Sequence, residues 1–284
     1  MTTTIQTPLI VGFVADIMFT TRIAAAAQRA GFRLHWVEDA QAISTPTPQA
    51  PTETPGEMLY GREGQLFAQM TAWQPALLLF DLTNTAVPWQ TWIPILKSSP
   101  ATRRIPIMCF GPHEDVERMQ LARRVGADIV LARSRFTTNM PQLLQQHARI
   151  PDHDAIGAAC AEPLPELAQR GIGLFNKGDY YQCHDDLEEM WRQDAGPGRD
   201  LYRGILQVGI ALYQVQQGNY RGAVKMLLRV RQWLAPLPAT CRGVDIARLR
   251  ANVETYYQQV QTLTADNLHQ FDWTVVEPIH VQQG

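Results

Sequence analysis

The sequence predicts two domains of different class: an N-terminal α/β domain with a five-stranded parallel sheet, and a C-terminal all-helical domain. Three observations carry this prediction. Over residues 1–149, short continuous apolar runs alternate with helical patterns, which is typical of a parallel sheet covered on both faces. From residue 165 onward helical periodicity dominates. Between the two, "IPDHDAIGAACAEPLP" breaks both patterns and predicts a linker over residues 150–164.

Five apolar runs are expected to form the strands, each with a helical stretch behind it. They are "LIVGFV" (9–14), "FRLHWV" (32–37), "ALLLFDL" (76–82), "IPIMCF" (105–110) and "ADIVLA" (127–132). The first helix, "TTRIAAAAQRAG", is expected to end at Gly31. This series of strand–helix units fits a doubly wound, flavodoxin-like layout. Residues 44–56 are too rich in proline for a helix or inner strand and are predicted to be a loop.

The C-terminal domain (165–264) is predicted to contain helices at about 164–177, 179–194, 199–217, 219–235 and 242–263, with no strand between them. Two of these helices begin alike, with Gly178-Asp179-Tyr180 and Gly218-Asn219-Tyr220. In each case glycine is expected to end one helix, and the Asp or Asn side chain to cap the next. The domain is therefore predicted to be a compact helical bundle with tetratricopeptide-like hairpins, followed by an extended C-terminal tail over 265–284.

The composition limits the classes of function. With a formal net charge of -2 over 284 residues, the chain offers no overall positive field for nucleic acid. No apolar run reaches the ~18 residues of a membrane span, and the N-terminus lacks the basic region of a signal peptide. The cysteines form no CxxC pair, which predicts neither a disulfide framework nor a zinc ribbon and fits a reducing cytosol. A cytoplasmic protein with a protein partner is expected, without nucleic-acid or membrane binding, and a homo-oligomer is left open.

The run "PALLLFDL…IPIMCFGPHEDVERMQLARRVGADIVLARSRF" resembles the receiver domain of two-component response regulators, over about residues 7–148. The resemblance places Asp81, at the end of the third strand, in the position of the phospho-acceptor. In that family phosphorylation also needs a Mg²⁺ held by an acidic pair after strand one. A Thr or Ser after strand four and a Lys after strand five complete the set.

Only Asp81 of that set is present here. The other positions hold Val14 and Ala15 (acidic pair), Gly111 (hydroxyl) and Arg133 (lysine), with Asp16 one place late and Ser134 in place of a proline. A single carboxylate without its metal partners cannot support phosphoryl chemistry. The sequence therefore predicts a pseudo-receiver, in which Asp81 is an inactive phospho-acceptor position and the domain is a platform for protein contacts.

The segment "FNKGDYYQCHDDLEEMWR" (175–192) combines acidic residues with a helical apolar stripe. Since residues three and four apart share a helix face, the stripe is expected to include His184, Glu188 and Trp191. The remaining acids are expected to face solvent: Asp185, Asp186 and Glu189. The next helix is apolar nearly all round, so its polar residue Gln207 is predicted to pair with the His184/Glu188 face. Gly204 and Gly209 in that helix allow a neighbouring helix to approach closely.

The pattern F-N-x-G-x-Y…H-x-x-L-E-x-x-W, followed by G-I-L-Q and G-N-x-x-G-A, is similar to a family catalogued as domain of unknown function 309. It covers about residues 165–237 and is carried by Phe175, Asn176, Gly178, His184, Leu187, Glu188, Trp191, Gly204 to Gln207, Gly218, Asn219, Gly222 and Ala223. The resemblance implies a small all-helical domain whose activity is not established. The family often has Glu after the histidine and a second His near the end of the central helix, where this chain has Asp185 and Gln214.

Three interpretations stay open for the polar residues on the His184/Glu188 helix face, called the polar seam below. His184 and Glu188 could be the centre of a metal-dependent or acid/base, hydrolase-like enzyme, although zinc sites use at least three protein ligands. They could instead be a buried hydrogen-bonded pair that fixes helix packing. The seam could also line a ligand groove, together with Trp191, Arg203, Gln207, Tyr213 and Asn219. The sequence favours a non-enzymatic regulatory or scaffolding protein that acts through protein or small-ligand contacts, and it predicts no cofactor.

Overall fold

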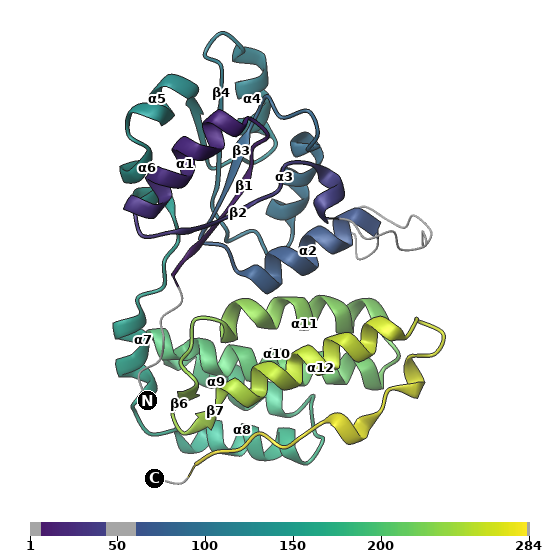
Figure 1. The fold of residues 1–284 in the computed structure, drawn as a ribbon. Coiled ribbons are helices and arrows are strands. Elements are labelled where there is room, and N and C mark those ends of the chain that lie inside the picture. Colours follow the sequence, from purple (N-terminus) through teal and green to yellow (C-terminus); the bar gives the residue numbers. More distant parts are fainter. Residues whose placement is uncertain (1–6, 44–60, 283–284) are drawn as a thin grey trace. The chain divides into compact units, whose positions relative to one another are not determined.

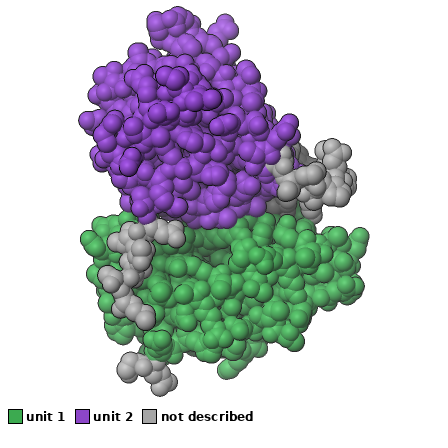
Figure 2. Space-filling view, viewed as in Figure 1, with its two compact units in different colours: residues 1–5, 151–284 green, residues 6–150 purple. Residues whose placement is uncertain are grey.

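The computed structural model describes residues 7–43 and 61–282 (Figure 1). The chain divides into two compact units after Ile150, an α/β unit and a helical unit, which Figure 2 colours purple and green. The predicted loop 44–56 lies outside the described residues. Segment 150–164, the predicted linker, contains helix α7 (His153–Cys160). Among the described helices, none is both long enough and apolar enough to cross a membrane.

The α/β unit is built on a five-stranded parallel sheet with strand order β2-β1-β3-β4-β5. The strands are β1 (Leu9–Phe13), β2 (Arg33–Trp36), β3 (Leu77–Asp81), β4 (Ile107–Gly111) and β5 (Ile129–Ala132). Every residue of β3 and β4 is buried, as expected for central strands that are covered on both faces. The order is that of flavodoxin-like doubly wound folds, so the predicted fold class of this domain is confirmed.

Helices cover both faces of the sheet (Figure 1). One face carries α1 (Ile17–Arg29), α5 (Arg133–Thr138) and α6 (Met140–His147), and the other carries α2 (Gly61–Trp73), α3 (Trp89–Ser98) and α4 (Val116–Arg124), with a short 3-10 helix, η1 (Ala40–Ile43), after β2. Phe110 of β4 stacks on Phe136 of α5 within one core. On the opposite face Phe13 of β1 stacks on Phe80 of β3 and meets Trp92 of α3 edge-on. These aromatic contacts hold the helix layers against the sheet.

The helical unit packs successive helices against one another. After α7 they are α8 (Glu166–Asn176), α9 (Cys183–Gln193), α10 (Asp200–Gln216), α11 (Tyr220–Leu234) and α12 (Ile246–Thr262), with 3-10 helices η2 (Pro197–Arg199), η3 (Leu268–Gln270) and η4 (Trp273–Val275). The prediction of an all-helical core is confirmed. A hairpin of two short strands, β6 (Thr240–Cys241) and β7 (Val244–Asp245), was not predicted, because two-residue strands show no alternating pattern.

The helices end and begin at the predicted glycine and capping residues, with one exception. Gly178 and Gly218 have φ of 84° and 68°, the left-handed conformation that ends a helix. Asn219 caps α11 by accepting from the backbone N–H of Gly222 at 3.0 Å. The predicted cap by Asp179 is wrong, since α9 begins only at Cys183 and residues 180–182 form a turn. The backbone oxygen of Asp179, and not its side chain, accepts from the Cys183 N–H.

The two glycines of α10 let its neighbours approach closely, as predicted. A Cβ atom at Gly204 would lie 2.4 Å from Cδ2 of Leu234 on α11. A Cβ atom at Gly209 would lie 2.7 Å from Sγ of Cys183 on α9. Both distances are well inside van der Waals contact, so these positions have no room for a larger residue.

A disulfide joins Cys160 of α7 to Cys241 of β6. The expectation that the cysteines form no disulfide is therefore wrong for this pair. The two residues are 81 apart in sequence, so local spacing carried no sign of the bond. The remaining cysteines, Cys109 and Cys183, are buried free thiols.

Candidate functional site

Asp81 ends β3 at the carboxyl edge of the sheet, and two residues hold its side chain. Nη2 of Arg133 donates to Oδ1 at 3.1 Å and to Oδ2 at 3.0 Å. Oδ1 also accepts from the backbone N–H of Thr83 at 2.9 Å and from the Thr83 hydroxyl at 2.7 Å. The Asp81 side chain is 3% exposed. The carboxylate is therefore buried, hydrogen-bonded and paired with a cation.

The strand order brings Arg133 to Asp81. Arg133 directly follows β5, and the carboxyl ends of parallel strands meet at one edge of the sheet. Its guanidinium also lies 5.2 Å from the ring centre of Phe19, a cation–π contact that orients it. The sequence comparison marked Arg133 only as a replacement for lysine, and its pairing with Asp81 was not predicted.

Asp16, the carboxylate nearest in sequence to the predicted metal-pair positions, caps helix α1. Its Oδ1 accepts from the backbone N–H of Phe19 at 3.1 Å. In the part of the chain that the structure describes, no group of three or more His, Cys, Asp or Glu side chains is arranged to hold a metal ion. Asp81 is thus paired with a guanidinium from the position where the receiver pattern has lysine, while the acidic-pair positions hold Val14 and Ala15.

A cavity of about 490 Å³ opens beside Arg133 at the same edge. It is lined by Phe19, Arg22, Pro112, His113, Glu114, Arg133, Ser134 and Thr137. Arg22 and Arg133 bring positive charge to this lining and Glu114 brings negative charge, and Arg133 is already paired with Asp81.

His184 and Glu188 lie one turn apart on α9, with Nε2 and Oε2 3.7 Å apart. Their side chains are 33% and 31% exposed, so they do not form the buried pair that one interpretation expected. Glu188 also accepts from Arg192 at 2.8 Å, and His184 lies 3.3 Å from Asp185. All these contacts run along one helix and do not fix α9 to α10.

The predicted pairing of Gln207 with the His184/Glu188 face is wrong. Oε1 of Gln207 accepts from Nε1 of Trp233 on α11 at 3.1 Å. Trp191 faces arginines: the guanidinium carbons of Arg199 and Arg203 each lie 4.5 Å from its ring centre. Arg203 also lies 4.1 Å from the ring centre of Trp233. Stacked tryptophan and arginine side chains thus join α9, α10 and α11.

The last two predicted seam residues lie in separate contacts. Tyr213 meets Tyr181 with ring centres 5.1 Å apart. Asn219, besides capping α11, donates from Nδ2 to Oε1 of Gln214 at 2.6 Å. The predicted seam is therefore divided into several small clusters along the helices.

Asp186 is the buried acid of α9, which corrects the expectation that it faces solvent. Arg170 of α8 donates to both of its oxygens, from Nε at 2.6 Å and from Nη2 at 2.5 Å. These hydrogen bonds lower the pKa of Asp186 from its ordinary value. A carboxyl with a depressed pKa stabilises the fold above its unfolded-state pKa, and this contribution is lost as the pH falls through the folded-state value. The pair ties α8 to α9, whereas one interpretation of the sequence expected His184 and Glu188 to fix α9 against the following helix.

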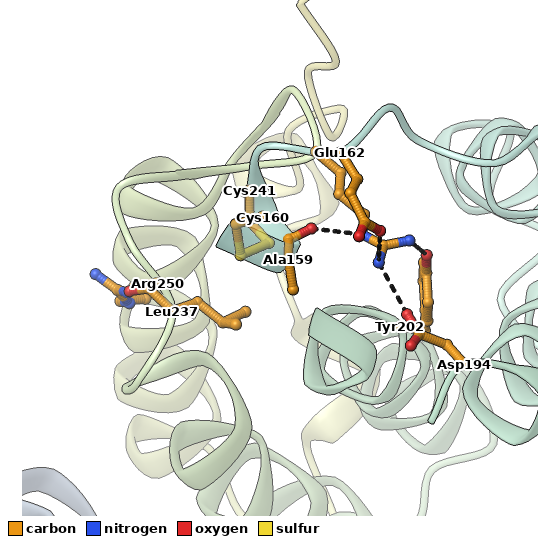
Figure 3. Close-up of a disulfide and its surroundings, with 9 residues drawn as sticks. Ala159, Cys160, Glu162, Asp194, Tyr202, Leu237, Cys241 and Arg250 are labelled. Carbon is orange, nitrogen blue, oxygen red and sulfur yellow. Dashed lines mark hydrogen bonds and ion pairs between the residues drawn. A yellow bond between two sulfur atoms is a disulfide. The ribbon is translucent and has the colours of Figure 1, made fainter. Parts of the chain in front are cut away.

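Arg242 forms a second cluster that sequence reasoning missed. It donates to the backbone oxygen of Ala159 at 3.2 Å, to the Tyr202 hydroxyl, and to the carboxylates of Glu162 (2.8 Å) and Asp194 (3.0 Å). Figure 3 shows these four partners on one side of the Cys160–Cys241 disulfide. The cluster joins α7 to α10 and to the end of α9. Its partners come from three distant segments, so no motif could indicate it.

Alanine at His184 or at Glu188 is expected to lower the free energy of unfolding by less than about 1 kcal/mol. The reason is that half-exposed ion pairs within one helix contribute little. Leu187→Ala is the matched control on the same helix: its side chain is fully buried, so we expect a loss of about 2–5 kcal/mol. Chemical denaturation measures all three values.

Metal analysis of the same proteins tests the enzymatic interpretation. Stoichiometric metal in the wild-type chain that is lost from the His184 and Glu188 variants, while both stay folded, would establish a metal site.

The fold and these sites define a receiver-like α/β unit followed by a helical unit. Residues 168–226 match the model of a family described as "Domain of unknown function (DUF309)", which confirms the predicted family resemblance of the helical unit. The chain is also similar over 90 residues to an uncharacterized protein of Aquifex aeolicus, at 29% identity, and to the uncharacterized protein YpuF of Bacillus subtilis, at 31% identity. Each alignment covers 31% of this chain, and 27% and 52% of the relatives' own lengths.

Solved structures of response regulators are similar to this chain in fold. The chemotaxis response regulator CheY4 of Vibrio cholerae is 12% identical with a TM-score of 0.37, covering 50% of this chain and 98% of that chain. Full-length FixJ from B. japonicum is 17% identical with a TM-score of 0.34, covering 95% and 96%. The strand order of the α/β unit is what confirms its receiver-like fold.

Proposed function

We propose that this chain is a non-enzymatic regulatory protein whose receiver-like unit works without phosphorylation, as a platform for protein contacts. The observation that carries the proposal is the bonding of Asp81. Both of its oxygens are engaged by Arg133, and one is engaged by Thr83 as well. Arg133 pairs with this carboxylate and Oδ1 accepts three hydrogen bonds, which lowers its reactivity as a nucleophile. The sequence also has Val14 and Ala15 where the receiver pattern needs an acidic pair to hold Mg²⁺.

Exposed apolar side chains at the same edge of the sheet support a protein-contact role. Ile17 and Met18, at the start of α1, are 76% and 79% exposed, and Val116 at the start of α4 is 54% exposed. Helices α1 and α4 begin after β1 and β4, so these residues lie at the carboxyl edge of the sheet. Adjacent, highly exposed aliphatic residues favour burial against a partner surface. The cavity beside Arg133 supports the small-ligand form of the same proposal. A cytoplasmic location remains part of the proposal.

Incubation with acetyl phosphate and Mg²⁺ is expected to leave Asp81 unmodified. Intact-mass measurement detects the mass of one added phosphoryl group, and Asp81→Asn is the control that removes the acceptor. Arg133→Lys restores the lysine of the receiver pattern, and we expect this variant to stay unlabelled too, because Val14 and Ala15 provide no metal ligands. A label that appears on the wild-type chain and disappears in Asp81→Asn would overturn the proposal.

A further inference from the structure

Residues 271–282, called the strap below, lie on the helical unit and, after the 3-10 helix η4, run on without further helix (Figure 1). The strap adds to the edge of the β6–β7 hairpin, where Val281 pairs with Val244 in an antiparallel bridge. The backbone N–H of Gln282 donates to the oxygen of Gly243 at 2.8 Å, and that of Asp245 donates to the oxygen of His280 at 3.2 Å. The strap is thus bound partly as an extra strand.

The side chain of Asn176, the last residue of α8, binds the main chain of the strap. Its Oδ1 accepts from the backbone N–H of Ile279 at 2.7 Å, and its Nδ2 donates to the Ile279 oxygen at 3.1 Å. The amide side chain pairs with both main-chain groups of one residue, as a neighbouring strand does. Because these bonds involve only the backbone, they hold any extended segment irrespective of the side chain at that position.

The strap side chains alternate between the helical unit and solvent. Ile279 is 6% exposed and Val281 is partly buried, whereas Pro278, His280 and Gln282 are exposed. Glu277, two positions before Ile279, pairs with Arg248 of α12 at 2.7 Å. A period of two is that of a strand bound by one face. The strap therefore presents an acidic residue and two aliphatic residues to the helical unit at alternate positions.

Gly243 lets the strap approach the hairpin. A Cβ atom at this position would lie 2.9 Å from the backbone oxygen of Gln282, closer than a side chain tolerates. Its φ of 78° also requires glycine. The hairpin edge is thus shaped to receive another backbone.

We propose that Asn176, the β7 edge and Arg248 form a peptide-docking site, which the strap occupies in cis and from which an extended segment of a protein partner displaces it. The partner segment has the pattern acidic-x-aliphatic-x-aliphatic, the chemistry of Glu277, Ile279 and Val281. In strand addition of this kind, main-chain hydrogen bonds give affinity and alternate side chains give specificity. A covalently attached strap competes at a high effective concentration, so the site is closed until a tighter segment arrives.

This inference extends the proposed function, because it supplies a contact surface for a partner on the helical unit. The proposed function and this inference rest on different residues, so each can be refuted separately. Phosphoryl labelling tests Asp81, and peptide binding tests the docking site.

The test uses the full chain and a labelled synthetic peptide of residues 271–282. In the strap-released variant, Ile279→Asp with Val281→Asp, the docking site is unchanged while the binding of the strap to it is weakened. Fluorescence anisotropy is expected to show at least about tenfold tighter peptide binding to this variant than to the wild-type chain. Adding Asn176→Ala to the released variant is expected to weaken binding at least about tenfold, because the paired main-chain hydrogen bonds are lost. A peptide that carries the Ile279→Asp change is the matched control and should not bind.

Several results would overturn the proposal. Equal binding to the released and wild-type chains, or no binding to either, means that the strap does not compete for a peptide site. Loss of helical circular dichroism in the released variant means that the strap is a fixed part of the fold. A wild-type dimer in sedimentation that the peptide dissociates means that the occupant is the strap of a second copy.

Discussion

Replacing Arg242 by alanine is expected to lower the free energy of unfolding by about 3–5 kcal/mol. The guanidinium is 6% exposed and pairs with Asp194, whose side chain is 14% exposed. Removing it leaves a nearly buried carboxylate without its cation, and a backbone oxygen at Ala159 and a hydroxyl at Tyr202 without this donor. Such a loss exceeds the value of the pair itself, because the remaining groups stay desolvated. Denaturant unfolding followed by circular dichroism measures it.

The backbone at Arg242 requires a second variant as control. Arg242 and Gly243 form the two-residue turn of the β6–β7 hairpin, with φ of 50° and 78°. Asparagine is favoured in such a turn, so Arg242→Asn is compatible with the positive φ at this position while it removes the guanidinium. We expect Arg242→Asn to lose nearly as much stability as Arg242→Ala. An Arg242→Asn protein as stable as wild type would show that the turn, and not the ion pairs, accounts for the effect.

Arg192→Ala is the matched surface control. Its side chain is 60% exposed and pairs with Glu188 within α9. We expect a loss below about 1 kcal/mol, as for other exposed pairs one turn apart. The contrast between the two arginines tests whether burial decides the value of these ion pairs.

The sequence predicted the fold wherever an element's own hydrophobic pattern was strong. Strands β3 and β4 were visible as short continuous apolar runs, and α10 as an apolar stretch of helical length, because elements buried on most sides are apolar along their whole length. The hairpin at Arg242-Gly243 gave none, since its strands are two residues long and arginine is not a typical residue for its turn. The start of α9 was missed because Asp179 looked like a cap while the chain makes a turn first.

The candidate sites were predicted less well, because their contacts are long-range. Helical spacing placed His184 beside Glu188 correctly. It could not show that Asp186 faces Arg170 on another helix, or that Arg133 reaches Asp81 across the edge of the sheet. Those pairings depend on how whole elements pack. A single sequence carries the periodicity of each element but not the register between elements.

Removing the Cys160–Cys241 disulfide is expected to lower the free energy of unfolding by about 4–5 kcal/mol by the chain-entropy estimate for a long closed loop. The bond spans a separation of 81 residues, so it restricts the unfolded chain strongly. The double variant Cys160→Ala with Cys241→Ala tests this by denaturant unfolding. Reducing agent is the internal control: it should destabilise the wild-type chain and leave the double variant unchanged, because Cys109 and Cys183 are free thiols in both.

Thiol counting decides whether the bond forms. Alkylation of the unfolded wild-type chain is expected to modify Cys109 and Cys183 only, and modification of all four cysteines would contradict the disulfide. Alkylation in intact cells shows whether the bond survives where the protein resides, which bears on the cytoplasmic assignment because disulfides are rare in a reducing cytosol.

The disulfide and Arg242 are expected to be coupled. Arg242 follows Cys241, its backbone N–H donates to the oxygen of Cys160 at 2.7 Å, and two of its side-chain partners, Ala159 and Glu162, lie beside Cys160. Without the disulfide, α7 is held less firmly and the guanidinium loses part of its support. Arg242→Ala should therefore cost at least about 0.5 kcal/mol less in the double-alanine background than in the wild-type chain. A double-mutant cycle measures this difference, and strict additivity would mean that the two features stabilise the unit independently.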